Sequence, residues 1–363
     1  MHRRLRVVHL VDDTTAGGVM RVLDYIKTAP AMVDLANHAF ETVQRGKMSA
    51  RCYEADIIVS HLAISWRTLP ALMALRLANR GKRLVHVEHS YTEGFVCHNV
   101  PNTARFHSLL RCGFAVFDAV VAVSHAQADW LRRTRICPER KLFTIRSCVD
   151  LSEFAEIAPV CRQPRVLGAV GRLDRQKGFD TLIKGFKRYQ NPEAELHFYG
   201  TGDALPELQA IAEGDTRIQF KGFCSNPLTP YRNVDIVVVP SRWEAYGLVA
   251  IEALCAGRRV ICADVDGLRD HQDYGAQLFG GQSGQEITAQ IEKVFKGECD
   301  ACTMSGNDIS AHAQQAFAGG WKNLFEALTS SEPGHKQESG NIFDNLWVHR
   351  RRLGTCDRAH HTK

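Results

Sequence analysis

Two glutamates separated by seven residues, Glu244 and Glu252, have the chemistry and spacing to hold one ligand. Glu244 lies in a polar turn, and Glu252 lies about one turn into the apolar segment 248–255, which predicts a helix closed by Gly257. Carboxylates accept hydrogen bonds in pairs, which suits the hydroxyl groups of sugars. Alternatively, Glu244 is a helix-capping acid and Glu252 an ordinary solvated residue.

The start of that helix is a candidate phosphate site. The first backbone N–H groups of a helix lack partners within it, and the helix dipole adds positive charge there. The start falls at Tyr246, Gly247 and Leu248, and Gly247 lets a ligand approach the backbone closely. An anion site between two acids that bind hydroxyls predicts a sugar nucleotide as the ligand.

A second candidate for binding phosphate is the loop after the predicted strand 166–171. Arg172 and Lys177 are five residues apart on this loop, which leaves the carboxyl end of a buried strand. Two cations there could neutralise a diphosphate and stabilise the charge it gains as a leaving group. The alternative is a pair of solvated loop cations.

Other polar or glycine-rich turns follow predicted strands, where doubly wound folds place their ligands. Gly17 and Gly18 follow strand 6–11, and Gly200 and Gly202 follow strand 195–199. His89 ends strand 84–89. Each signal is weak alone, because glycine pairs are more often tight turns and a histidine can simply pack inside the fold.

Taken together, these segments resemble the retaining glycosyltransferases of family 4, also called glycosyl transferases group 1. The matching motifs are the E-x7-E segment from Glu244 to Glu252 and the string G-R-x-x-x-x-K-G from Gly171 to Gly178. The resemblance implies an α/β fold of the GT-B type, with two doubly wound Rossmann-like domains facing a central cleft. It also implies transfer of a sugar with retention at the anomeric carbon, by front-side attack assisted by the leaving diphosphate.

The resemblance assigns roles to individual residues. Glu244 would hold sugar hydroxyls, Glu252 the ribose, Arg172 and Lys177 the diphosphate, and His89 the sugar or its phosphate from the opposite wall. The catalytic set is then Glu244, His89, Arg172 and Lys177. The donor site comprises Gly17, Gly18, Gly171, Arg172, Lys177, Gly200, Gly202, Glu244, Tyr246, Gly247, Leu248 and Glu252.

We expect a nucleotide-diphosphate sugar as donor substrate and neither a cofactor nor a metal. Asp264 and Asp266 spell the D-x-D signature of metal-dependent glycosyltransferases, but that signature belongs to a different, single-domain fold. Here the two aspartates follow a strand late in the second α/β half. The sequence shows no general base for the acceptor, which suits a mechanism in which the leaving phosphate takes the proton.

The predicted organisation is an acceptor-side domain over 1–158 and a nucleotide-sugar domain over 159–310. A closing helix over 311–329 would cross back to the first domain, and the role of 330–363 is not assigned. Residues 30–55 are poorly patterned, so we expect a trimmed first domain. Ser147 and Cys148 replace the family's Asn and Gly in the hinge, so that turn lacks its usual residues for positive φ.

Composition places the chain among globular proteins. It has 363 residues, 45% hydrophobic and 23% charged, enough for two domains. Twelve cysteines are scattered, and the close pair Cys299 and Cys302 lacks a second pair at zinc-site spacing, so we expect a reducing cytosol. No apolar run is long enough to cross a bilayer.

The first half is the more basic half, which suggests an anionic surface as a partner. Basic residues gather on or beside two predicted helices near Trp66 and Trp130. They are Arg67, Arg76, Arg80, Lys82, Arg83, Arg132, Arg133 and Arg135. Such a face could rest on an anionic membrane and collect a lipid-linked acceptor, whereas nucleic-acid binding is not indicated. The alternative is ordinary solvated helix faces.

The resulting hypothesis is a cytoplasmic hexosyltransferase of bacterial surface polysaccharide synthesis, peripheral on the inner face of the plasma membrane. One rival is a GT-B sugar-nucleotide epimerase or phosphorylase. The other is a catalytically silent GT-B binding module.

Overall fold

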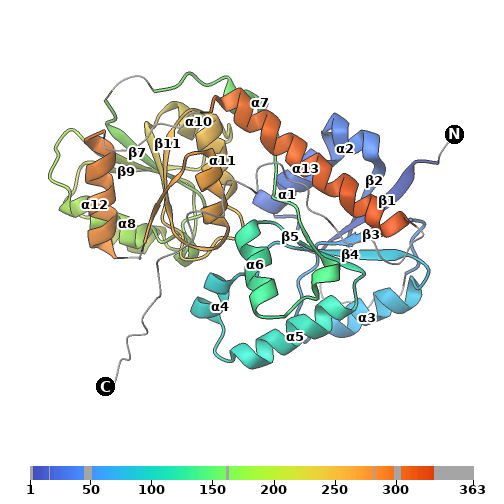
Figure 1. Ribbon diagram of the computed structural model, residues 1–363. Coiled ribbons are helices and arrows are strands. Elements are labelled where there is room, and N and C mark those ends of the chain that lie inside the picture. The colour runs from blue at the N-terminus through green and yellow to red at the C-terminus, as the bar shows by residue number, and fades with distance from the viewer. Residues whose placement is uncertain are drawn as a thin grey trace, which may run out of the picture. The chain divides into compact units, whose positions relative to one another are not determined.

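The computed structural model describes residues 3–15, 17–44, 51–160, 163–280, 283–297 and 304–330. The Cys299 and Cys302 pair and the segment 331–363 lie outside the described residues. Residues 1–328 form one compact unit. It contains two six-stranded parallel sheets with helices between the strands, as the GT-B hypothesis predicts (Figure 1).

The first sheet has the order β2-β1-β3-β4-β5-β6. All its pairings are parallel, so the carboxyl ends of its strands lie along one edge. Its strands are β1 (Leu5–Val11), β2 (Ala36–Thr42), β3 (Ile57–Ser60), β4 (Arg83–Glu88), β5 (Ala119–Ala122) and β6 (Leu142–Thr144). The helices of this half are α1 (Gly18–Thr28), α2 (Pro30–Leu35), α3 (Leu69–Ala78), α4 (Glu93–Asn99), α5 (Thr103–Ala115) and α6 (His125–Arg133).

The second sheet has the order β12-β11-β10-β7-β8-β9, again with parallel pairings. Its strands are β7 (Val166–Val170), β8 (Glu195–Tyr199), β9 (Ile218–Gly222), β10 (Ile236–Val239), β11 (Arg259–Ala263) and β12 (Gln277–Phe279). The helices that follow its strands are α8 (Phe179–Arg188), α9 (Leu205–Ala212), α10 (Thr229–Arg232), α11 (Leu248–Cys255) and α12 (Gly284–Phe295).

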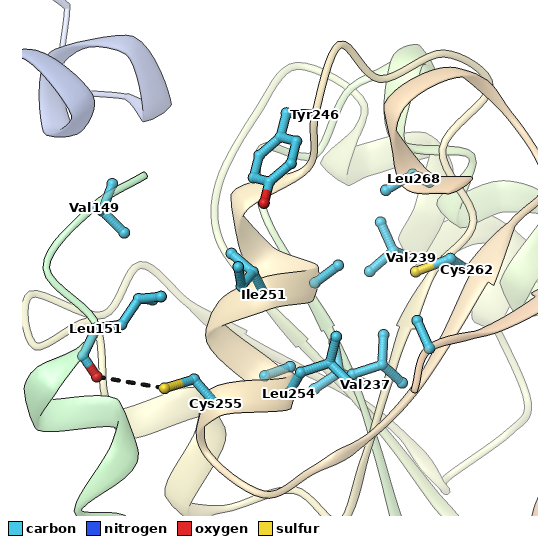
Figure 2. Packing of buried hydrophobic residues seen from close by; sticks show 14 of the residues in the cluster. Val149, Leu151, Val237, Val239, Tyr246, Ile251, Leu254, Cys255, Cys262 and Leu268 are labelled. Atoms are coloured by element: carbon cyan, nitrogen blue, oxygen red, sulfur yellow. Dashed lines mark hydrogen bonds between the residues drawn. The ribbon is translucent and has the colours of Figure 1, made fainter. Parts of the chain in front are cut away.

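Helix α11 is the centre of the second half, and its predicted bounds are confirmed. The apolar composition of this helix leaves no polar face, so it is buried on nearly all sides. Figure 2 shows Leu254 of α11 beside Val237 of the neighbouring strand β10. The Cys255 thiol donates to the Leu151 carbonyl at 3.5 Å, which ties the helix to the hinge segment.

The expectation of a trimmed first domain is wrong. The segment 30–55 contains α2 and the seven-residue strand β2, which pairs with β1 along its whole length. Alternating burial along β2 shows why it was missed: this edge strand has a solvated face and lacks the continuous apolar run of the central strands. The first half therefore has a complete six-stranded sheet.

The hinge does not need the residues that the family usually has there. Ser147 and Cys148 are both buried, and among the described residues the only non-glycine positions with positive φ are Arg135 and Asp266. The turn is therefore built without a left-handed residue. Within it, Ser147 N–H donates to the Val123 carbonyl at 3.3 Å.

A long closing helix, α13 (Gly306–Thr329), contains the predicted helix 311–329 and begins five residues earlier. Its first residue packs against the backbone of Ala155 and Cys255. Farther along, Trp321 packs edge-on against His9 of β1, and Arg83 of β4 donates to the Leu328 carbonyl at 2.9 Å. Figure 1 shows α13 running from the second half towards β1 of the first sheet. Within the described residues no helix combines the length and apolar composition needed to span a bilayer.

Candidate active site

Lys177 and Glu244 are brought into direct contact. Lys177 ends the 3-10 turn Arg175–Lys177 after β7, and Glu244 lies between β10 and α11. The Lys177 Nζ is 2.6 Å from Glu244 Oε2, and the two side chains are 16% and 15% exposed. Ser241 Oγ donates to the same carboxylate oxygen at 3.3 Å. Two of the residues predicted from separate motifs therefore form one charged pair.

Two hydrogen bonds hold the loop that carries Lys177 against the loop that carries Glu244. Arg242 N–H donates to the Gln176 carbonyl at 2.7 Å, and Gln176 Nε2 donates to the Trp243 carbonyl at 3.0 Å. Gly178 adopts a φ of 66° with its Cα against the Pro240 carbonyl, where a Cβ would overlap the oxygen. A side chain is thus excluded at the point where the loops meet.

Arg172 is not brought to the Lys177–Glu244 pair. Its side chain is 75% exposed, and its Nε lies 3.5 Å from Asp174 Oδ2. The convergence of Arg172 and Lys177 on one anion, expected from their spacing, is therefore not seen. The role of Arg172 in binding a diphosphate stays a prediction.

Three predicted donor-site glycines pack against loop backbone. A Cβ on Gly200 would overlap the Gly171 carbonyl, and a Cβ on Gly202 would overlap the Leu173 carbonyl. The close approach of the two loops explains why glycine is needed at both positions. Contact of Gly171, Gly200 and Gly202 with a donor stays a prediction.

The start of helix α1 lies beside the start of α11. The nearest atom to a Cβ built on Gly18 would be Leu248 Cδ1, at 3.3 Å. Gly247, the N-cap of α11, has a φ of 91° and no side chain to cap the helix. Tyr246 is buried, and its carbonyl accepts a hydrogen bond from His271 Nε2 at 2.8 Å. Gly18, predicted in the first half, thus meets the helix start predicted in the second, whereas a Cβ built on Gly17 would have, among the described residues, only the Thr15 carbonyl within 4 Å.

Glu252 is buried and tightly held, which a solvated helix residue would not be. Its Oε1 accepts from Arg21 Nη1 at 2.6 Å, and its Oε2 accepts from Tyr231 OH at 2.6 Å. Burial raises the pKa of Glu252, and the charge of Arg21 opposes that shift. Sequence reasoning missed Arg21 and Tyr231, because neither belongs to a recognisable motif.

Asp266 links the two halves next to Glu244. Its carboxylate accepts hydrogen bonds from Thr92 Oγ1 at 2.7 Å, Gly94 N–H at 3.0 Å and Glu244 N–H at 3.2 Å. Asp264, the other member of the D-x-D string, pairs with Arg269 at 2.5 Å. Among the described residues, no cluster of three or more His, Cys, Asp or Glu side chains is placed to hold a metal ion.

His89 lies at the carboxyl end of β4, three residues before the Thr92 that contacts Asp266. Its Nε2 is 2.8 Å from His61 Nδ1. Burial lowers the pKa of His89 to about 4, although neighbouring Glu88 favours the charged form. His89 is therefore a neutral imidazole at neutral pH.

Two family models match the chain, one in each of its two halves. Residues 12–153 match Glycosyltransferase Family 4, and residues 164–296 match Glycosyl transferases group 1. The chain is a GT-B glycosyltransferase of the family 4 type. The two matches divide the glycosyltransferase at the same linker that separates its two sheets.

Curated relatives resemble parts of this glycosyltransferase. It is 29% identical to the mannosylfructose-phosphate synthase of Agrobacterium fabrum over 207 residues, which are 50% of this chain and 46% of the relative. It is 35% identical to a glycogen synthase of Thermus thermophilus over 141 residues, 37% of this chain and 32% of the relative. The chain thus spans less than half the length of these two relatives.

Solved structures share the whole fold of this glycosyltransferase. A sucrose-phosphate synthase from Thermosynechococcus elongatus superposes with a TM-score of 0.70 at 20% identity, over 90% of this chain and 99% of the other. HepE of Anabaena, in complex with UDP and glucose, superposes with a TM-score of 0.66 at 18% identity, over 90% and 100%. These likenesses show the GT-B fold.

Proposed function

We propose that this protein transfers a hexose from a nucleotide-diphosphate sugar to a hydroxyl of a saccharide acceptor, with retention at the anomeric carbon and without a metal. The observation that carries the proposal is the Lys177–Glu244 pair beside the start of α11. The ammonium group contacts the carboxylate, and a Cβ built on Gly247 would lie 3.2 Å from Glu244 Cγ, so the carboxylate lies beside the helix start. A cation with free amides suits a diphosphate, and a carboxylate suits sugar hydroxyls.

In the proposed reaction, the bond between the anomeric carbon and the diphosphate oxygen breaks, and its electron pair stays with the diphosphate. The acceptor hydroxyl oxygen forms the new bond on the same face, and its proton passes to the leaving phosphate. Lys177 and the first amides of α11 stabilise the charge on the diphosphate. Glu244 holds the sugar, and the Lys177 contact keeps its carboxylate in place.

Glu252 has a further role in the proposal, at the ribose end of the donor. Its two oxygens are occupied by Arg21 and Tyr231, yet each carboxylate oxygen can accept a second hydrogen bond. A ribose hydroxyl would add to this arrangement. Arg172, which is exposed, would turn from Asp174 towards the diphosphate when the donor binds.

The proposed acceptor is lipid-linked, in bacterial surface polysaccharide synthesis, and the enzyme is peripheral on the inner face of the plasma membrane. Support comes from an exposed apolar patch on and before α3: Trp66, Met73 and Leu77 are 46%, 53% and 59% exposed. The Arg105 guanidinium lies over the Trp66 ring, and exposed Arg67 and Arg80 flank the helix. Apolar side chains bordered by cations suit an anionic bilayer.

The wider basic face expected from the sequence is reduced in the structure. Arg76 pairs with Asp118, Arg132 with Asp129 and Glu139, and Arg133 with Glu93. Trp130, expected beside this face, is 2% exposed and packs in the core. The proposed membrane contact therefore rests on the patch formed by Trp66, Met73 and Leu77, which we call the α3 patch.

The test is a ligand and product screen of the full chain. Nucleotide diphosphates that bind only the folded state raise its melting temperature, and UDP is the first to try because HepE was solved with it. Candidate UDP- and GDP-sugars are then incubated with and without acceptor, with EDTA present, and the anomer of the product is determined by NMR. Conversion of donor alone would indicate an epimerase, and phosphorolysis of a glycoside a phosphorylase. Binding without turnover would indicate a silent module.

A further inference from the structure

Four histidines form a continuous row across the first sheet. They are His38 on β2, His9 on β1, His61 just after β3 and His89 just after β4. These strands are adjacent in the order β2-β1-β3-β4, so the row has one imidazole per strand. Ring centroids are 5.2, 5.3 and 5.1 Å apart along the row, close to the ~4.8 Å between neighbouring strands.

Each histidine is hydrogen-bonded to the next through its ring nitrogens. His9 Nε2 is 2.9 Å from His38 Nδ1, and His9 Nδ1 is 3.0 Å from His61 Nε2. His61 Nδ1 is in turn 2.8 Å from His89 Nε2. A neutral imidazole has one donor and one acceptor nitrogen. All hydrogen bonds along such a row must therefore point the same way, from donor to acceptor.

The far end of the row fixes that direction. His38 Nε2 is 3.2 Å from the Met32 carbonyl, which can only accept, so His38 must carry its proton on Nε2. His38 Nδ1 then accepts from His9, His9 Nδ1 accepts from His61, and His61 Nδ1 accepts from His89. The opposite direction would place a lone pair of His38 against the carbonyl oxygen.

The row is kept neutral by burial. The pKa values of His38 and His89 are lowered to about 4, and those of His9 and His61 lie well below the usual value, with desolvation as the largest cause. The facing charged groups do not reverse this. Arg4 further lowers the pKa of His38, whereas Glu88 favours the charged form of His89 without overcoming burial.

Apolar and aromatic groups hold the rings in place. Phe40 of β2 stacks on His9 with a centroid distance of 4.7 Å and an interplanar angle of 12°. Trp321 and Phe325 of the closing helix α13 pack against His9 and His38. The helix that crosses back from the second half thus covers the His38 and His9 end of the row.

We infer that His38, His9 and His61 are positioning residues that lock His89 in its Nε2–H tautomer and present its Nδ1 as a hydrogen-bond acceptor. Among the described residues none is hydrogen-bonded to His89 Nδ1. An unprotonated Nδ1 can accept a hydrogen bond from a hydroxyl but cannot donate one to a phosphate. The row therefore selects a sugar hydroxyl, of the donor or of the acceptor, as the group that His89 contacts. This inference rests on the proposed function.

The primary test reads the tautomer without any activity. In the full chain with ¹⁵N-labelled histidine, long-range ¹⁵N–¹H correlation spectra distinguish Nε2–H from Nδ1–H and from the imidazolium. We expect Nε2–H at all four positions between about pH 6 and 8, as their lowered pKa values require. An Nδ1–H tautomer or an imidazolium at His89 would overturn the inference, whether or not transfer is detected.

The second test is a pair of substitutions in the middle of the row. In H61Q the side-chain amide can accept from His89 and donate to His9, whereas in H61L it can do neither. We expect H61L to lower kcat/KM about 10-fold or more, and H61Q to retain most of it. Comparable loss in both variants would contradict the inference. If H61L does not fold, kcat/KM is compared in the same way between H38Q and H38L, which change the histidine at the end of the row.

Controls separate the tautomer effect from loss of a buried histidine and locate the hydroxyl. His197, 7% exposed on β8 in the second half, is outside the row, so H197L should leave kcat/KM and the His89 signal unchanged.

A rise confined to the KM for donor in H61L assigns the hydroxyl to the donor sugar, and one confined to the KM for acceptor assigns it to the acceptor. Absence of transfer with every donor, with the four Nε2–H signals intact, would remove the proposed function and leave the tautomer assignment standing.

Discussion

Arg21 of α1 places its Nη1 2.6 Å from Oε1 of Glu252 in α11, across 231 positions of sequence. The carboxylate is 3% exposed and the guanidinium 37% exposed, so the pair is open to solvent on the arginine side only. The Tyr231 hydroxyl donates a hydrogen bond to Oε2, the other oxygen of the Glu252 carboxylate. The second E of the E-x7-E motif is thus bound by both halves of the chain.

Arg21→Ala should destabilise the protein by about 1–3 kcal/mol, because it leaves a buried carboxylate with one hydrogen-bond partner fewer. The measurement is urea unfolding followed by circular dichroism. Lys27→Ala, which removes an exposed cation from the same helix, is the matched control and should be neutral within about 0.5 kcal/mol. Equal stability of the two variants would show that the Arg21 contact contributes nothing.

The same variant should change how stability depends on pH. Burial raises the pKa of folded Glu252 above its unfolded value of 4.5, so the folded state binds more protons and stability falls as pH rises from 4.5 to the folded pKa. Without Arg21 that pKa rises further and the fall extends to higher pH. The measurement is the free energy of unfolding at pH 5 and at pH 7.5. Its decrease between these two pH values should be larger in Arg21→Ala than in wild type. Adding Glu252→Gln should abolish the difference.

Lys177→Met should reduce kcat by about 10²- to 10³-fold, the usual effect of removing a group that stabilises charge in the transition state. The melting temperature is measured alongside, because Glu244 loses its partner. Lys184→Met, on the exposed face of α8, removes the same charge away from the site and should leave kcat unchanged. A Lys177→Met enzyme with unchanged turnover would contradict the proposed role of the pair.

Gly94→Ala should disturb the Asp266 contact and lower both stability and turnover. A Cβ at Gly94 would lie 2.6 Å from Asp266 Oδ2 and 3.0 Å from Trp243 Cβ, so the neighbours must shift, typically at about 1–3 kcal/mol. Gly81→Ala is the matched control, because nothing lies within 4 Å of a Cβ there. Thermal melts and transfer rates compare the two. The interpretation fails if both variants behave like wild type.

The α3 patch makes the membrane proposal testable. Co-sedimentation with anionic liposomes at low salt should decrease several-fold in a Met73→Ser, Leu77→Ser variant, because both side chains are exposed on one face of the helix. Phe223→Ser, which removes a 74% exposed ring from the second half, should sediment like wild type. No sedimentation of the wild-type chain at low salt would refute the membrane contact itself.

Several parts of the fold and site follow from local sequence. The apolar run of β10, the turn at Gly247 and the apolar segment of α11 follow one another along the chain, so their order predicts strand, loop and helix start. The predicted Lys177 and Glu244 meet because both follow strands that pair directly, β7 and β10. Parallel strands bring their carboxyl ends to one edge, so the meeting follows from the fold class alone.

Other features depend on strand order and on contacts between the halves, which local patterns do not encode. The edge strand β2 was missed because its alternating burial resembles a loop with scattered apolar residues. The histidines on β1 and just after β3 and β4 are visible in the sequence, but their row exists only because the sheet order is β2-β1-β3-β4. The burial of Glu252 likewise needs Arg21 and Tyr231, from distant segments. The sequence by itself determined which residue types stand at the strand ends, because that information is local. The tertiary structure alone decided which of them share a proton, a charge or a hydrogen bond, because those interactions require atoms within about 3 Å of each other.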